Sequence, residues 1–107
     1  MFYLLDAAHR QILYVSPAYA TIWQQSCASL YADPQSWSAS IHPDDRWMLA
    51  ELMGNLQASG RTDCEYRILR PDGSVRWIHD RSFPILDAAG QLYRVARLAE
   101  DITERRQ

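Results

Sequence analysis

The strongest constraint on the fold is a pair of strand-like segments, residues 63–70 and 74–86, joined by the turn sequence PDG at residues 71–73. Proline presets the backbone at the first turn position, and glycine supplies the positive φ that closes such a turn. We therefore expect the two segments to pair as an antiparallel hairpin. A third strand-like segment, residues 91–100, follows a glycine-bearing loop, so the C-terminal part is expected to contain three consecutive strands.

Pro84 lies inside the second of these segments. A proline is tolerated within a strand where the N–H group that it lacks has no neighbouring strand to face. If the hairpin pairs through residues 71–73, the position opposite Pro84 lies near Arg61, where the preceding strand is only beginning. The expected pairing is therefore compatible with this proline.

The middle of the chain carries three helix starts, each marked by a proline at or just inside the first turn. Proline is well tolerated there, because the N–H group that it lacks would have no partner within the helix. The starts are Ser16-Pro17 before residues 18–23, Asp33-Pro34 before residues 35–40, and His42-Pro43 before residues 46–60. We therefore expect three helices between the N-terminal and C-terminal strands.

The third of these helices has the clearest core-facing side. Asp44 and Asp45 lie in its first turn, where the helix dipole favours negative charge. An apolar stripe at i, i+3, i+4 and i+7 spacing consists of Leu49, Leu52, Met53 and Leu56. Gly60 follows as a C-terminal stop. This helix is expected to pack its stripe against the sheet.

The N-terminal segment contains two short apolar strands, residues 2–5 and 12–15, joined as a hairpin by residues 6–11. Both strands are continuous apolar runs, which are typical of strands covered on both faces. The helices can cover only one face of a single sheet. We therefore expect the other face to meet a second copy of the chain in a weak homodimer, or a helix N-terminal to Phe2.

Composition excludes several classes of function. With 107 residues, 48% of them hydrophobic, the chain is expected to form one globular domain with a modest core. A net charge of −2 argues against nucleic-acid binding, which favours a basic surface. The apolar runs are too short for a membrane span. Cys27 and Cys64 form no motif and are expected to be free thiols of a cytoplasmic protein.

The final nine residues, AEDITERRQ, begin a helix that this sequence does not complete. Asp101 has the chemistry of an N-cap, because its carboxylate can accept from backbone N–H groups two or three residues later. Glu104 stands where a capping box places Glu or Gln. Two interpretations remain open from these residues alone: a helix that leads into a further segment, or a polar tail that frays.

Five stretches of the sequence, in this order and at this spacing, resemble a PAS domain of the bacterial signalling type with a PAC-like C-terminal half. They are ILYVSPAY at 12–19, Trp37 followed by SIHPDDR at 40–46, EYRILRPDGSVRWI at 65–78, FPILDAAGQLYRV at 83–95 and DITERRQ at 101–107. The resemblance implies an α+β fold, with a five-stranded antiparallel sheet of order 2-1-5-4-3 and short helices on one face. It also implies a single domain over residues 1–100.

The resemblance gives the C-terminal residues a role. In this family, an Asp-Ile-Thr triplet ends the last strand and begins the helix that carries the signal to an output module. Residues 101–107 are therefore expected to begin a signalling helix or linker to a covalently linked output domain, a histidine kinase or a cyclic-di-GMP enzyme. The implied signal-transmission residues are Asp101, Ile102, Thr103 and Glu104.

Several large side chains are candidates for a pocket between the sheet and the helices. The candidate lining residues are Trp23, Trp47, Met53, Tyr66 and Trp77. The alternative interpretation is that they are ordinary core residues, with each tryptophan N–H bonded to a carbonyl. One position departs from the family pattern. Arg97 stands where the family often has glycine, so its side chain is expected to narrow the pocket or to add a polar contact there.

We expect no catalytic residue, no metal site and no coloured cofactor. No histidine lies inside the third helix, where some PAS domains hold haem. Neither cysteine matches the Asn-Cys-Arg-Phe type of motif of the photochemical flavin-binding subclass. The pattern of His42 beside Asp44 and Asp45 is explained as a helix start. A flavin without the reactive cysteine, or a small uncoloured ligand, is also compatible with the sequence.

The sequence therefore predicts a non-enzymatic sensory or regulatory domain of a larger bacterial signalling protein, which relays the state of a ligand or partner to an output domain. Two alternatives stay open at this point. One is a redox or gas sensor that depends on flavin or haem, and the other is a ligand-free dimerisation module.

Overall fold

The computed structural model describes residues 1–6 and 11–106, apart from the side chains of residues 53, 56 and 57. It contains a five-stranded antiparallel sheet in the order β2-β1-β5-β4-β3, which confirms the predicted sheet and fold class. The strands are β1 Phe2–Asp6, β2 Ile12–Val15, β3 Thr62–Leu69, β4 Val75–Leu86 and β5 Leu92–Asp101. The helices are α1 Ala18–Trp23, α2 Cys27–Ala32, α3 Ser36–Ala39, the 3-10 helix η1 Pro43–Met48, α4 Leu49–Ser59 and α5 Thr103–Arg106.

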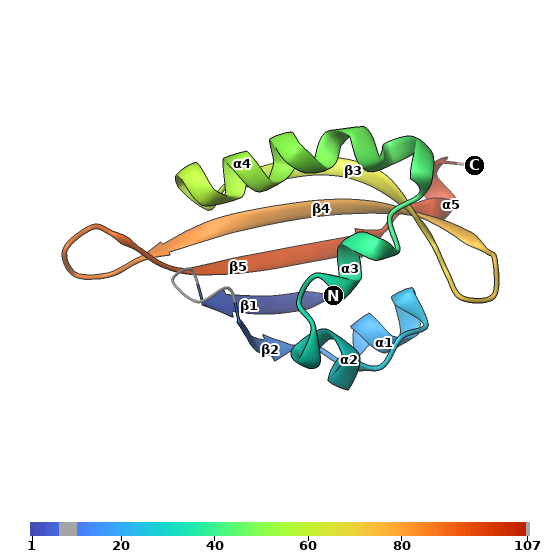
Figure 1. Ribbon diagram of the computed structural model, residues 1–107, viewed down its shortest axis with the longest axis horizontal. Coiled ribbons are helices and arrows are strands. Elements are labelled where there is room, and N and C mark those ends of the chain that lie inside the picture. Colours follow the sequence, from blue (N-terminus) through green and yellow to red (C-terminus); the bar gives the residue numbers. More distant parts are fainter. Residues whose placement is uncertain (7–10, 107) are drawn as a thin grey trace.

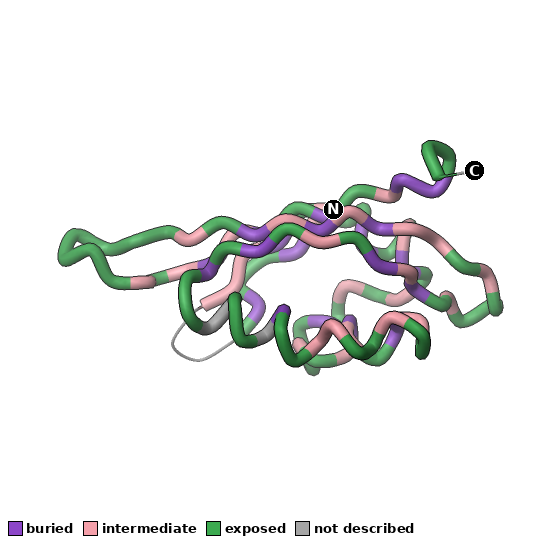
Figure 2. The backbone as a smooth tube through the Cα atoms, turned by 90° about the horizontal axis from the view of Figure 1, so that it is seen from above, coloured by how far each residue is buried: buried purple, intermediate pink, exposed green. Residues whose placement is uncertain are grey.

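The helices lie on two sides of the sheet. Helices α1 to α4 lie along one face, which we call the inner face, and α5 stands on the opposite, outer side (Figures 1 and 2). Because side chains alternate along a strand, β4 sends Ile78, Asp80 and Ser82 to the inner face, where all three are buried. The C-terminal helix therefore leaves the domain on the side away from the other helices.

The C-terminal strands pair as predicted. Residues Thr62 to Leu69 of β3 pair with Ser82 to Val75 of β4, and the connecting turn closes through Gly73 at φ 88°. Pro84 pairs with Val95 of β5 and lies two residues beyond the last residue of β4 that pairs with β3. The expectation that β3 only begins near Pro84 is confirmed.

The N-terminal strands also form as predicted, with β1 between β2 and β5. The N–H group of Asp6 donates to the carbonyl of Gln11 at 2.9 Å, which closes the base of the hairpin. The predicted turn residues 7–10 lie outside the described part of the chain. Tyr3, Ile12 and Val15 are buried, so these strands contribute directly to the core.

The helical region differs from the sequence prediction in two places. Helix α2 was not predicted, because no proline marks its start; instead, Ser26 caps it by accepting from the N–H group of Ser29 at 3.1 Å. The long helix predicted over residues 46–60 is divided, since Pro43–Met48 form a 3-10 turn before α4 begins. Gly60, at φ 71°, ends α4 as predicted.

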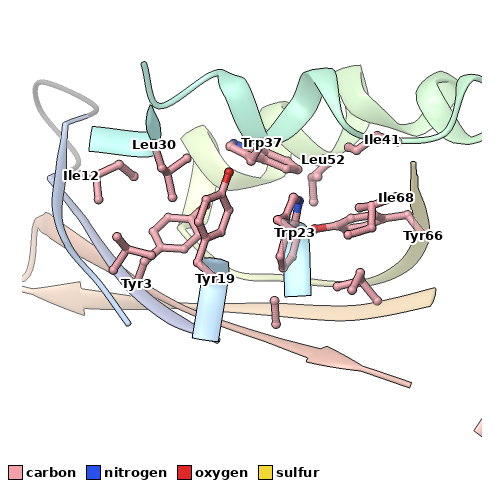
Figure 3. Close-up of a cluster of buried hydrophobic side chains, with 13 residues drawn as sticks. Tyr3, Ile12, Tyr19, Trp23, Leu30, Trp37, Ile41, Leu52, Tyr66 and Ile68 are labelled. Atoms are coloured by element: carbon pink, nitrogen blue, oxygen red, sulfur yellow. The ribbon is translucent and has the colours of Figure 1, made fainter. Parts of the chain in front are cut away.

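The core lies between the inner face and helices α1 to α4 (Figure 3). The rings of Tyr19 and Trp23 stack with centroids 5.3 Å apart. Trp23 is buried, and its indole N–H donates to the hydroxyl of Ser40 at 2.9 Å. Trp37 packs on Tyr66 with centroids 6.2 Å apart. This layer of aromatic side chains covers the central strands and encloses the polar cluster described next.

Candidate functional site

A buried ion pair lies on the inner face of the two central strands. Arg97 of β5 and Asp80 of β4 are each 2% exposed, and the Nε atom of Arg97 donates to Oδ1 of Asp80 at 2.9 Å. The register pairs Arg97 with Ser82, so Asp80 is two residues along the same face of β4. Strand alternation therefore brings both charges inside, where each needs the other because an isolated buried charge is very costly.

Two tyrosines extend this pair into a network. The hydroxyl of Tyr66 donates to Oδ2 of Asp80 at 2.5 Å, and Nη1 of Arg97 donates to the hydroxyl of Tyr3 at 2.5 Å. Burial raises the pKa of Tyr3 to about 12 and that of Tyr66 well above its usual value. Both tyrosines therefore stay protonated at neutral pH and act as neutral hydrogen-bonding groups.

The guanidinium of Arg97 also lies against Trp37. Its central carbon is 4.2 Å from the ring centroid of Trp37, within the range of a cation–π contact. Burial lowers the pKa of Arg97, but Asp80, Tyr3 and Tyr66 together outweigh that effect, so the pKa is raised well above its usual value. The Nη2 atom of Arg97 is buried and has no hydrogen-bond partner within the described part of the chain. One polar atom of this network thus remains available inside the domain.

A separate groove lies at the edge of the sheet, between α4 and β3. It has a volume of about 290 Å³. Its lining residues are Trp47, Met48, Glu51, Leu52, Asn55, Thr62, Asp63, Cys64 and Glu65. Burial raises the pKa of the Cys64 thiol to about 12, so this cysteine is a neutral and poorly nucleophilic part of the wall.

The C-terminal junction is held by hydrogen bonds to β4. Oδ1 of Asp101 accepts from the backbone N–H of Thr103 at 3.0 Å, and Oδ2 accepts from Nε of Arg76 at 2.7 Å. The hydroxyl of Thr103 accepts from the N–H group of Trp77 at 2.9 Å, and the N–H group of Ile102 donates to the carbonyl of Trp77 at 2.9 Å. The junction is therefore attached to β4 through both backbone and side chains.

These contacts set the charge state of Asp101. Partial burial raises its pKa, but the hydrogen bonds from Arg76 and Thr103 outweigh that effect and lower it below the usual value of 3.8. Ile102 and Thr103 are buried, whereas Glu104 is exposed. Asp101 is thus ionised at neutral pH. It accepts from Thr103, the first residue of α5, and lies one residue before the N-cap position, which Ile102 occupies because its carbonyl accepts the first helical bonds.

The comparisons with known proteins agree with this architecture. The sequence pattern of the PAS fold matches residues 12–99. The chain belongs to the PAS fold family. A search of curated proteins gives no match. This PAS domain is 32% identical to a domain assigned to a light and redox sensing histidine kinase from Haloarcula marismortui, with a TM-score of 0.79 over 95% of this chain and 88% of that one.

Two further solved structures resemble this PAS domain. The sensory box histidine kinase/response regulator from Burkholderia thailandensis is 29% identical, with a TM-score of 0.70 over 98% of this chain and 78% of that one. The N-terminal domain of a diguanylate cyclase with PAS/PAC sensor from Marinobacter aquaeolei is 19% identical, with a TM-score of 0.87 over 99% of this chain and 97% of that one. The last likeness concerns the fold alone.

The four candidate pocket residues whose side chains the structure describes do not converge on one cavity of this PAS domain. Trp23 and Tyr66 lie in the core (Figure 3), whereas Trp47 is 77% exposed on η1 and lines the edge groove. The placement of Trp77 in an inner pocket is wrong. Ile78 points inward, so its neighbour Trp77 faces outward, where it contacts α5. The side chain of Met53 lies outside the described residues.

Sequence reasoning found Arg97 but missed its partners. Asp80 and Tyr3 both lie at strand positions that face the inner side of the sheet. The signal that would have identified Asp80 was a charged residue at such a position. The expected polar contact of Arg97 is confirmed, since this buried side chain bonds to Asp80 and Tyr3 above the central strands. This PAS domain therefore contains a buried polar network beneath its aromatic layer.

The remaining chemical candidates have structural explanations. Nδ1 of His42 accepts from the N–H group of Asp44 at 3.1 Å, which is the predicted helix-start role. His79 contacts Asp63 at 2.7 Å. Within residues 1–6 and 11–106, no three metal-ligating side chains gather at one point, and none of the helices has the length and apolar character needed to cross a bilayer. Cys27 and Cys64 are both free thiols.

Proposed function

We propose that this PAS domain is a sensory module of a larger signalling protein. The domain passes a change in its buried polar network to an output domain through α5. One observation carries the proposal. Arg97, in the buried polar network, and Asp101, which accepts from the first residue of the exit helix, lie four residues apart on β5. A change at the inner network therefore acts on the same strand that fixes the start of α5.

The neighbouring β4 supports the same route. Asp80 is the inner partner of Arg97, while Arg76 and Trp77 hold the junction from the outer side. In this proposal, residues 1–100 form the sensing domain and residues 101–107 begin the signalling segment. The output domain is a histidine kinase or a cyclic-di-GMP enzyme, the classes to which the similar domains described above belong.

The test compares two capping variants in the full-length protein. Asp101→Ala removes the acceptor for Thr103 and Arg76, at a local cost of about 1 kcal/mol. Because a shift of about 1.4 kcal/mol changes a two-state equilibrium tenfold, output activity or its response to signal is expected to change strongly, while the melting temperature falls only slightly. Asp72→Ala is the control, since Asp72 also accepts from the backbone N–H two residues later, at Ser74 in the β3–β4 turn, and its hydrogen-bond partners belong to that turn and to Gln24 rather than to α5. Unchanged output and regulation in Asp101→Ala would refute the proposal.

We also propose that the domain works without haem or flavin. The space above the central strands, where a flat ring would sit, is filled by Arg97, Trp37 and Tyr66, which hold one another in place. The unpartnered Nη2 of Arg97 is suited to one water molecule or to the oxygen of a small polar ligand. A visible absorbance band of haem or flavin that survives purification would contradict this proposal, and mass spectrometry of the denatured protein would identify an uncoloured ligand.

A further inference from the structure

A group of aromatic and cationic side chains holds α5 against the outer face, in addition to the cap at Asp101. The guanidinium carbon of Arg106, in the last turn of α5, lies 4.0 Å from the ring centroid of Trp77. Nη2 of Arg106 also lies 3.4 Å from Oε1 of Glu65 on β3. Since Trp77 and Glu65 belong to different strands, Arg106 attaches α5 to both β4 and β3.

A second arginine contacts the same ring. The guanidinium carbon of Arg67, on β3, lies 5.3 Å from the ring centroid of Trp77. Each arginine has its own carboxylate partner, Asp45 for Arg67 and Glu65 for Arg106. Trp77 is therefore in contact with two arginines that are each paired with a carboxylate, one from the edge strand and one from the exit helix.

Arg67 is itself fixed from the helical layer. Asp45 of η1 accepts from Nε of Arg67 at 3.0 Å, from Nη2 at 2.7 Å and from the backbone N–H at 2.8 Å. The backbone just before η1 is attached at the same point, since the N–H group of His42, the residue that precedes η1, donates to the carbonyl of Arg67 at 2.8 Å. A continuous chain of contacts thus runs from η1, around the sheet edge, to α5.

The edge groove adjoins both ends of this chain of contacts. Trp47 and Met48 of η1 form part of its wall on the helical side, and Glu65 forms part of its wall on the strand side. Asp45 precedes Trp47 by two residues within η1, and Glu65 is the residue that pairs with Arg106. A displacement of η1 relative to β3 therefore acts on Arg67 and Arg106 together.

We propose that Trp77 and Arg106 are positioning residues for the output helix, and that Asp45 of η1 controls their contact through Arg67. The docking itself is a property of the 107-residue chain, and its role in signalling rests on the proposed function. This route runs over the outer edge of the sheet and is separate from the inner network of Arg97 and Asp80.

The first experiment measures amide hydrogen exchange by NMR at Arg105 and Arg106, whose N–H groups donate to the carbonyl of Ile102. Asp45→Ala is compared with Asp44→Ala, because Asp44 is the adjacent, exposed carboxylate that does not bind Arg67. Asp45→Ala is expected to raise exchange at these two amides about twofold, the size of a modest coupling between residues in one network. Exchange at the buried Val95 of β5 reports any global destabilisation.

The second experiment changes Arg106 on α5 and observes Arg67 on β3. It keeps the proposal testable if Asp45→Ala unfolds the chain. Arg106→Ala is compared with Arg105→Ala, whose side chain pairs with Glu100 instead. Arg106→Ala is expected to shift the Nε–H resonance of Arg67 and to raise exchange at Ile102 by about two- to fivefold, as the loss of an exposed cation–π contact implies. Arg106→Lys, which keeps the charge, is expected to restore part of the contact.

The outcomes separate the inference from the proposed function. Equal exchange at α5 in Asp45→Ala and Asp44→Ala, or an Arg67 resonance unaffected by Arg106→Ala, would overturn the inference. If instead exchange changes as expected while Arg106→Ala leaves the output of the full-length protein unchanged, the docking contact stands and the proposed signalling role fails.

Discussion

At the scale of single residues, the most demanding feature is the buried charge of Arg97. A charge in the interior is tolerated when it is paired and hydrogen-bonded. Arg97 meets this condition through Asp80 and Tyr3. Replacing one partner of such a pair leaves the other as an uncompensated charge, whereas replacing both with apolar residues often costs little.

Asp80→Ala is therefore expected to lower the free energy of unfolding by about 3–5 kcal/mol. The matched control is Asp63→Ala, because the Asp63 carboxylate is 70% exposed and should contribute less than about 1 kcal/mol. The double variant Asp80→Leu/Arg97→Met is expected to be more stable than Asp80→Ala. Urea denaturation of the three variants checks this order, and equal losses for Asp80→Ala and Asp63→Ala would contradict it.

Asp101 gives a pH prediction at the same scale. Its pKa in the folded protein lies below the usual 3.8, so its ionised form stabilises the fold. That contribution is complete above about pH 4 and is lost as the pH falls through the lower, folded value. The amide resonance of Thr103 is expected to stay unchanged between about pH 7 and 5 and to shift only in stronger acid. An NMR titration tests this, and a transition near neutral pH would contradict it.

At the scale of elements, local signals in the sequence located most strands and helices. The PDG turn, the glycine-bearing loop and the apolar runs are short-range features, so the strands were predicted to within one or two residues. Helix α2 was missed because a serine cap alone is a weak signal. The division between η1 and α4 was also missed. The start of η1 is attached to β3 through His42 and Asp45, which bind Arg67, and such a tertiary contact cannot be read from local sequence.

The candidate site was less predictable than the fold, for a physical reason. The sequence identified Asp101 and Arg97 as unusual, but which face of a strand a residue occupies depends on the register. Trp77 was therefore assigned to the wrong side of the sheet. The hydroxyl of Thr103 accepts from Trp77, 26 residues away in the chain, and no spacing rule connects the two positions.

Two glycines provide a prediction about elements. A Cβ atom at Gly60, where φ is 71°, would lie 2.9 Å from Cδ1 of Leu92 and 3.1 Å from Cβ of Pro84. Gly60→Ala is expected to lower the free energy of unfolding by about 1–3 kcal/mol. Gly54→Ala, in α4 with nothing within 4 Å, is expected to raise it by up to about 1 kcal/mol. Thermal unfolding measures both, and a neutral Gly60→Ala would show that α4 ends differently.

At the scale of the whole molecule, the two faces of the sheet differ in their cover. The inner face is covered by the helical segment that runs from α1 to α4, whereas the outer face has α5 near one end (Figure 2). Phe2, Tyr14, Phe83 and Leu98 remain between 36% and 47% exposed, and Phe2 packs beside Tyr14 with ring centroids 6.2 Å apart. Exposed apolar patches on a soluble domain commonly mark an interaction surface.

We therefore predict weak homodimerisation through the outer face. Sedimentation velocity over a range of concentrations is expected to show a monomer–dimer equilibrium, and Leu98→Arg is expected to weaken it by at least about tenfold, because a cation would be buried in the interface. Leu86→Arg is the control, since Leu86 is equally apolar but lies at the end of β4, near the β4–β5 turn. A chain that stays monomeric at every concentration would contradict the prediction.

The spacing of Arg97 and Asp101 gives β5 the geometry of a lever. Four residues of strand, at about 3.3 Å each, separate the two side chains by about 13 Å. If β5 tilts by about 5° about Arg97, Asp101 at its end moves by about 1 Å. The hydrogen bond from Nε of Arg76, on the neighbouring strand, to Oδ2 of Asp101 is 2.7 Å long, and a lengthening of about 1 Å is enough to break it. A tilt of this size is therefore enough to break the bond from Arg76 to Asp101, which removes one of the attachments that hold the exit helix to the sheet.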